Sequence, residues 1–432
     1  MKKTLLLSVV ASTMIMAGGD IAPVEPVIVE EVSAWEFGGQ AVAYTQTIDD
    51  QGLGDLFAGS STYGALGLQL SAVNTDILYG FGAGVELSAI RQSDKYSQNY
   101  TGGNAQTQSG GFTQAYLTYG MDSINTSVKV GRQTLPKALS PFAFSEGWQV
   151  FKNTFDAALV VNTSIPDTAL VYAYVTRSNR SVGQLDNFQD ISAFGSGAVP
   201  ANDNVHMLTA SNQSIDALTL TGSYYFAANM TSDASVLLGG LTGNPLFRGG
   251  DTQIWWIDAK YKTDMFTIAG QGGQVKPDGL DDTTAWGAKI GGNLGMFGLS
   301  AAYSSVDDGA VPVYNMGTNV KTPLYTQSVL DQNTISLDSD TVKLSATMKA
   351  LGGGFGLHYI YSDLGDAARS SVFNNGNGLF PAGSGDYTEV DFTYKAKVFE
   401  NTTVFAAYVY QDDDRLVDSQ NFVRFWARYN FN

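Results

Sequence analysis

Paired carboxylates and scattered basic residues are the side chains of this sequence that could do chemistry. Glu389 and Asp391 are two positions apart, a spacing that places both carboxylates on one face of a β-strand. Acid–base catalysis by such a pair needs an apolar pocket that separates the two pKa values, but the two carboxylates share their strand face with Thr393 and Lys395. The chain has no cysteine and only two histidines, His206 and His358, so thiolate nucleophiles and histidine-built metal centres are excluded. The sequence therefore predicts neither an enzyme nor a cofactor.

The charge balance limits the partners. The chain carries 24 Lys and Arg against 41 Asp and Glu, a formal net charge of −17, which argues against a nucleic-acid partner. Most of the acid lies in the segments expected to be long loops, as in the runs at 281–282, 307–308 and 412–414. Their oxygen atoms could bind Ca²⁺, or bridge to lipopolysaccharide through divalent cations. Solvated carboxylates without a specific ion are the alternative, and the sequence leaves a metal site undecided.

The N-terminal segment predicts export. Lys2 and Lys3 precede an apolar run over 4–16, which ends in the small residues Ala17, Gly18 and Gly19. This order is typical of a secretory signal peptide. We therefore expect a signal peptide over 1–19, a periplasmic segment over 20–33 and one folded domain over 34–432.

The elements that position the charged residues are predicted by a period of two. Beyond the N-terminal segment no run approaches the ~20 apolar residues of a membrane-spanning helix. Instead, segments of about ten residues alternate between apolar and polar side chains, as in strands that face lipid on one side and water on the other. In 342–349, Val342 and Leu344 alternate with Lys343 and Ser345, and the same pattern recurs in 388–398 and 423–431.

Short and long connections alternate between these segments. The short turns are expected at 74–79, 122–123, 165–168, 214–216, 263–264, 292–295, 351–353 and 399–401. The long loops are expected at 48–61, 93–109, 134–153, 178–204, 228–251, 276–282, 307–337, 363–385 and 411–419. They join about 18 strands, an even number that returns both ends to the periplasm, as in bacterial outer-membrane barrels. The apolar stretch 235–241 is assigned to a loop, because another strand would break this parity.

A family resemblance adds to this interpretation. The sequence Gly-Arg-Gln at 131–133, Pro136, Trp148, Asn-Thr-Phe at 153–155 and Ile-Pro-Asp-Thr at 165–168 resembles the major outer membrane porins of Campylobacter-type bacteria. It is more distantly similar to the substrate-specific porins of pseudomonads. The resemblance implies an 18-stranded barrel in the outer membrane, often a homotrimer, whose third outer loop folds inward. The C-terminus departs from the usual barrel pattern, because Asn432 follows the final aromatic residue, Phe431.

The third loop is unusually apolar for a loop in water. It spans 134–153 and contains Phe142, Phe144, Trp148 and Phe151, which suits a segment packed against the inner wall. A loop that covers the barrel mouth or contacts a neighbouring subunit is the alternative. On the inward interpretation, Arg132 and Lys137 opposite Glu146 are the candidates for the constriction, where facing charges set up a transverse field.

Charged residues within the strands are expected to face the lumen, because Lys or Arg on the lipid face costs ~2–4 kcal/mol near the midplane. The predicted lumen-facing residues are Lys129, Asp258, Lys260, Lys289, Lys343, Glu389, Asp391, Lys395, Arg424 and Arg428. They would form a track for solutes or, alternatively, balance one another's charge.

These observations predict a passive, cation-preferring channel for ions and small hydrophilic solutes in a bacterial outer membrane. The expected partners are membrane lipid, lipopolysaccharide and the solutes. A surface adhesin or a structural barrel without a useful pore is the alternative function, and ion conductance would separate the two.

Overall fold

The computed structural model describes residues 35–49, 54–93, 105–180, 183–191, 204–228, 251–330, 332–368, 383–416 and 418–431. The predicted signal peptide, the segment 20–33 and the apolar stretch 235–241 lie outside these residues. Within them, no helix is long and apolar enough to cross a membrane.

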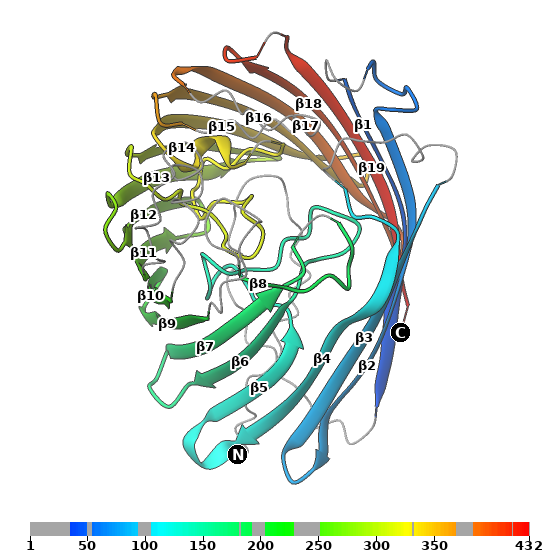
Figure 1. The fold of residues 1–432 in the computed structure, drawn as a ribbon, viewed down its shortest axis with the longest axis vertical. Helices are drawn as coiled ribbons and strands as arrows, with labels where there is room; N and C mark the ends of the chain where they lie inside the picture. The colour runs from blue at the N-terminus through cyan, green and yellow to red at the C-terminus, as the bar shows by residue number, and fades with distance from the viewer. Residues whose placement is uncertain are drawn as a thin grey trace, which may run out of the picture.

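The described chain forms one antiparallel sheet that closes on itself (Figure 1). The first strand, β1 (Glu36–Asp49), pairs with both β2 (Thr62–Leu78) and the last strand, β19 (Gln420–Phe431). The strands between them are β3 (Phe81–Gln92), β4 (Ser109–Met121), β5 (Thr126–Gln133), β6 (Phe155–Asn162), β7 (Thr168–Ser178), β8 (Gln189–Asp190), β9 (Val205–Ile215), β10 (Leu218–Ala227), β11 (Thr252–Lys262), β12 (Phe266–Pro277), β13 (Thr283–Leu294), β14 (Phe297–Val306), β15 (Ser339–Ala350), β16 (Gly353–Leu364), β17 (Gly385–Phe399) and β18 (Thr402–Asp413). Closure pairs the backbone groups of every long strand on both sides, so the barrel has no free edge.

The predicted fold class is confirmed. Of the 19 strands in the sheet, β8 has two residues and pairs only with the end of β7, while β7 pairs directly with β9. The barrel wall therefore consists of 18 antiparallel strands. Short connections lie at one end, here called the turn end, and long connections lie at the other, the loop end.

One predicted turn is shorter than expected. Strand β2 continues through most of 74–79 with an irregular register, and only Tyr79 and Gly80 connect it to β3. Both residues have positive φ, 50° and 82°. Two consecutive residues with positive φ form the tight hairpin turn whose twist matches that of the paired strands. The turn therefore uses no residue of 74–76, and Asn74 and Asp76 lie within β2.

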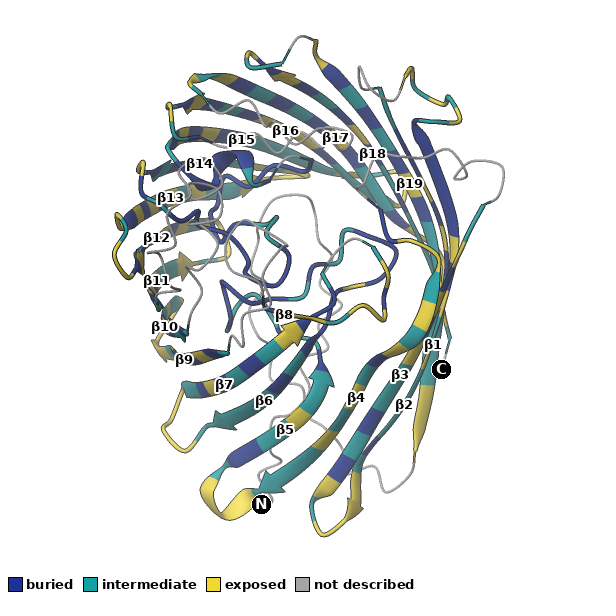
Figure 2. Cartoon of the chain, in the orientation of Figure 1, coloured by how far each residue is buried: buried dark blue, intermediate teal, exposed yellow. Residues whose placement is uncertain are grey.

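The two faces of the wall differ in chemistry, as the alternation predicts. In β15, Lys343 is 3% exposed and Leu344 is 50% exposed. Figure 2 shows the same alternation of buried and exposed residues along the other strands. Large apolar side chains are exposed on the outward face around the ring, among them Leu66, Leu117, Ile257, Ile290, Leu357, Phe392 and Phe425. An apolar surface that encircles a molecule is the surface expected of a barrel in lipid.

Two long connections lie inside the ring of strands (Figure 1). We call 134–154 the L3 segment and 307–338 the L7 segment. Phe142 of L3 packs edge-to-face against Tyr225 of β10 and Trp256 of β11, with ring centroids 5.6 and 5.4 Å apart. Val313, Met316 and other apolar residues of L7 join the same buried cluster. The core of this protein is therefore formed between the inner wall and two loops.

Candidate functional site

The ten strand residues predicted to face the lumen all lie on the inward side of their strands. Their neighbours in sequence, such as Val130, Ile257 and Phe425, are exposed on the outward side. The inward charges are not equally open to the lumen, however, because several of them hold the two inner segments in place.

Arg424 and Arg428 anchor the distal part of L3 to β19. Arg424 is 0% exposed, and its Nη1 and Nη2 donate hydrogen bonds to the Trp148 carbonyl at 2.9 Å and to Gln46 Oε1 at 2.6 Å. Its guanidinium carbon also lies 4.0 Å from the centroid of a Trp148 ring. Arg428 Nη2 donates to the carbonyls of Gln149 and Val150 at 3.0 and 3.1 Å. These arginines act on the loop backbone, a role that the strand pattern alone does not indicate.

Lys343 and Glu389 anchor L7 in the same way. Lys343 Nζ donates to the Gln327 carbonyl at 2.6 Å. Glu389 Oε1 accepts hydrogen bonds from the backbone N–H groups of Val329 and Leu330 at 2.6 and 3.0 Å. The sequence predicted L7 only as a long outer loop. Its apolar residues, among them Val313, Met316 and Leu324, are a signal that could have indicated a packed segment, as the aromatic residues of L3 did.

A group of basic residues lies where the end of L3 meets the inner wall. We define this basic wall cluster as Lys129, Lys152, Lys395 and Arg428, which interact electrostatically with one another or with Glu86. Glu86 accepts hydrogen bonds from Thr113 Oγ1 at 2.7 Å and from Gln114 Nε2 at 2.9 Å.

Two members of this region, Glu86 and Lys152, were not predicted from the sequence. Lys152 belongs to L3, where burial and the neighbouring Arg428 lower the pKa of its ammonium group. Glu86 could have been found, since the apolar residues Val85 and Leu87 flank it in the sequence and predict that it faces inward.

Of the predicted constriction residues, Lys137 and Glu146 both lie inside the barrel. Lys137 Nζ donates to the Thr322 carbonyl of L7 at 2.8 Å and to Gln327 Oε1 at 3.3 Å. Burial, assisted by the charge of Lys321, lowers the pKa of Lys137 to about 7. Burial raises the pKa of Glu146, and the positive charge of Lys321 opposes that shift. Both residues contact L7, so they do not face each other across an open gap.

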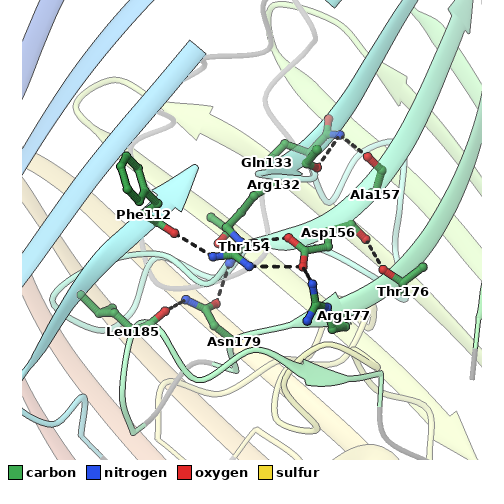
Figure 3. Close-up of polar contacts among 11 residues, drawn as sticks. Phe112, Arg132, Gln133, Thr154, Asp156, Ala157, Thr176, Arg177, Asn179 and Leu185 are labelled. Atoms are coloured by element: carbon green, nitrogen blue, oxygen red, sulfur yellow. Dashed lines mark hydrogen bonds and ion pairs between the residues drawn. The ribbon is translucent and has the colours of Figure 1, made fainter. Parts of the chain in front are cut away.

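Arg132 is not brought together with these two residues. It lies on the outward side of β5, two positions from exposed Val130, near the loop end. Figure 3 shows its contacts with Phe112 and Asp156. Asp156 of β6 accepts from Arg132 Nε at 2.9 Å and forms a second ion pair with Arg177 of β7 at 2.8 Å. The ring of Phe188 covers the Arg132 guanidinium, with the ring centroid 3.3 Å from its central carbon. Strand parity counted from Lys129 already places Arg132 outward, although its closeness to the loop in sequence suggested the constriction.

A cavity of about 310 Å³ lies between the first part of L3 and the inner faces of β9 to β12. Its lining includes Lys137 and Pro141 of L3 and Trp256, Asp258 and Lys260 of β11. Asp258 accepts a hydrogen bond from the hydroxyl of Tyr325 in L7. The lumen thus remains partly open on the turn side of L3.

The acidic runs lie at the loop end. Asp281, Asp282, Asp307, Asp308, Asp412 and Asp414 are exposed, whereas Asp413 is buried and paired with Arg415 at 2.6 Å. Within the described ranges, no three His, Cys, Asp or Glu side chains are grouped so that they could hold a metal ion.

Comparison with known proteins gives a structural likeness without a sequence match. No protein-family model matches the chain, and no curated protein matches its sequence, so the resemblance to Campylobacter-type porins is not confirmed. The fold is similar to Pseudomonas aeruginosa OpdO, with a TM-score of 0.67, 15% identity, and coverage of 93% of this chain and 98% of that one.

Two other solved structures show the same likeness. Acinetobacter baumannii OccAB2 has a TM-score of 0.67 and 15% identity, covering 93% and 98% of the two chains. Pseudomonas aeruginosa OccK2 (OpdF), solved in complex with glucuronate, has a TM-score of 0.67 and 14% identity, again covering 93% and 98%. At this identity the likeness establishes the fold, which matches the predicted similarity to pseudomonad proteins.

Proposed function

We propose that this chain is a porin of a bacterial outer membrane, which lets ions and small hydrophilic solutes diffuse passively through its lumen. The observation that carries the proposal is the division of a closed barrel into an apolar outward face and a charged inward face. The structural neighbours are outer-membrane porins of the Occ and Opd type, which supports the same function and location.

The division of faces determines the solvent on each side. An exposed apolar ring costs ~25 cal/mol for every Å² left in water, so the outward face is stable only in lipid. A charged residue placed there would cost ~2–4 kcal/mol near the midplane. The inward charges, including Lys129, Asp258 and Lys395, therefore require water in the lumen.

The constriction of this pore is formed by L3 together with L7. Lys137 and Glu146 lie in it through their contacts with L7. The basic wall cluster lies at the end of L3, where it interacts with Glu86 of β3. Both segments are fixed to the wall by buried hydrogen bonds, which gives the passage a defined width.

Cation preference arises at the mouth in this proposal. Exposed aspartates at 281–282, 307–308, 412 and 414 raise the local cation concentration over a range that salt shortens to ~8 Å at physiological ionic strength. The basic wall cluster has the opposite sign deeper in the lumen. The preference should therefore be modest and should decline as the salt concentration rises.

Planar bilayer recording tests the function directly. Purified protein should give discrete current steps that are linear with voltage, and a reversal potential of cation-selective sign in a KCl gradient. Liposome swelling should show entry of small sugars, and glucuronate, which one structural neighbour binds, should be included as an anionic solute. Protein that inserts fully folded but passes neither ions nor sugars would contradict the proposal and favour the adhesin alternative.

The assembly is a separate part of the proposal. The family resemblance implies a homotrimer, and the exposed aspartates of the loop end would bridge to lipopolysaccharide through divalent cations. Native mass spectrometry in detergent, with and without added lipopolysaccharide, should show three copies and bound glycolipid. A stable single copy without glycolipid would remove both statements while leaving the channel itself intact.

A further inference from the structure

One part of L7 crosses the lumen and docks on the opposite wall. L7 begins after β14 and returns to β15, yet the carbonyl of Gly317 accepts a hydrogen bond of 3.0 Å from Ser178 Oγ on β7. Residues 315–321 form a closed turn, because the Asn315 N–H donates to the Lys321 carbonyl at 2.6 Å. We call this turn the strap.

Gly317, at the tip of the strap, packs closely against Phe155 and Ser178 of the wall. We call this contact site the socket. A Cβ atom at Gly317 would overlap the ring of Phe155 on β6 and would lie 3.4 Å from Ser178 Oγ. Phe155 is fully buried and belongs to the same apolar cluster as Phe142 of L3. Glycine at 317 therefore allows the backbone to approach the wall closely.

The carboxylate of Glu146 connects the strap to L3. Its Oε1 accepts hydrogen bonds from Asn315 Nδ2 at 2.8 Å, from the Thr318 hydroxyl and from the Lys321 N–H at 3.4 Å. Glu146 is only 4% exposed. Three donors from one short turn thus converge on a single buried oxygen atom.

Backbone and amide contacts complete this interface. Asn315 Nδ2 donates to the Phe144 carbonyl at 2.8 Å, and its Oδ1 accepts from the Phe144 N–H at 3.1 Å. The Met316 N–H donates to the Phe142 carbonyl at 2.8 Å. All these contacts join the strap to L3 or to β6 and β7. These segments are far in sequence from β14 and β15, the strands that L7 connects.

The remainder of L7 is held independently of the strap. Val329 and Leu330 donate to Glu389, Tyr325 donates to Asp258, and the Thr326 and Ser304 hydroxyls are hydrogen-bonded. Consequently the strap can leave its socket while the rest of L7 stays on the wall. A segment held by a limited set of hydrogen bonds opens at a lower free energy than the sheet that carries it.

We propose that the strap is a detachable cross-bar of the pore, with Glu146 as the positioning residue that holds it docked. The inference rests on the proposed function, since it assigns two conductance levels to one channel. The docked strap gives the smaller level, because it fills space inside the barrel between L3 and the β6–β7 wall. The undocked strap gives the larger level.

Two variants test the strap from different sides. Gly317→Val fills the socket, and Glu146→Gln removes the charge on which the donors converge. Each substitution should increase the ratio of the time spent at the larger conductance level to the time spent at the smaller one by about tenfold, the factor that ~1.4 kcal/mol provides. Gly59→Val is the matched control, because a Cβ at Gly59 meets no atom within 4 Å.

A second measurement does not depend on current. Trypsin should cleave folded protein in detergent after Lys321 faster in both variants than in the wild type and in Gly59→Val, and gel mobility before heating confirms that each barrel is folded. A conducting wild type whose levels and Lys321 cleavage are unchanged by both substitutions would overturn the strap while leaving the porin proposal standing. A folded wild type without any conductance would instead overturn the porin proposal.

Discussion

Replacing Arg424 by methionine should widen the channel, because Arg424 fixes the distal part of L3 to the barrel wall. The substitution keeps the length of the side chain and removes its hydrogen bonds to the Trp148 carbonyl and Gln46 Oε1. It also removes the stacking of the guanidinium on Trp148, whose ring centroid lies 4.0 Å away. Trp148 packs edge-to-face on Phe405 with centroids 5.9 Å apart, so the aromatic contact alone would remain.

The expected change in free energy is the difference between the interactions that the substitution removes and the desolvation cost that it relieves. A hydrogen bond to a charged group contributes ~1.5–3 kcal/mol, and a cation–π contact that is out of water adds up to ~2 kcal/mol. Removing a buried charge relieves part of its desolvation cost, which offsets some of that loss. We therefore expect the anchored state of distal L3 to lose ~2 kcal/mol, about a thirtyfold change in its equilibrium.

Single-channel recording and proteolysis measure this effect. Arg424→Met should give a higher mean conductance and more current noise than the wild type, and trypsin should cleave after Lys152 in L3 more readily. Lys397→Met is the control, because Lys397 is exposed near the turn end. If Arg424→Met has wild-type conductance, noise and cleavage, Arg424 does not hold L3 in the channel.

Further substitutions test other parts of the account. Leu344→Arg should lower the free energy of unfolding in lipid by ~2–4 kcal/mol, whereas Thr219→Arg on the inward face, where the side chain lines the cavity, should not, as denaturant titration would show; equal losses would contradict the assignment of faces. Gly67→Val should push L3 from the wall and raise conductance, since a Cβ there would lie 2.7 Å from Phe151 and Val150 side-chain atoms, while Gly222→Val has open space and serves as control. Because burial sets the pKa of Lys137 to about 7, the lumen loses a positive charge as the pH rises through that value, so the cation-to-anion permeability ratio should increase. Lys137→Met should abolish that change, and a variant that keeps it would exclude Lys137 as the source.

The barrel was predictable because its signal is local. The alternation of Lys343 with Leu344 already indicates which face of the strand meets water. The same alternation recurs from strand to strand with the period of two residues that the pleat imposes. The aromatic content of 134–153 likewise indicated a packed segment. Parity of the strand count then required both ends of the wall to lie on the same side of the membrane.

The arrangement of the lumen was less predictable because its contacts are distant in sequence. Asn315 meets Glu146 across 169 positions, and no composition signal in either segment specifies that meeting. The roles of Arg424 and Arg428 depend on loop carbonyls, which have no sequence signature. The position of Arg132, in contrast, was predictable. Strand parity counted from Lys129 places its side chain outward, and only its closeness to L3 in sequence suggested that it belongs to the constriction.

Substituted-cysteine accessibility measures the central division between lipid and water most directly, because the native chain has no cysteine. Single cysteines at Lys129 and Ser345, and at their neighbours Val130 and Leu344, would be exposed to a charged, membrane-impermeant thiol reagent during bilayer recording. We predict stepwise loss of current for Lys129→Cys and Ser345→Cys and no response for Val130→Cys and Leu344→Cys. Current loss at the two apolar positions with none at the polar ones would show that water does not fill this side of the barrel.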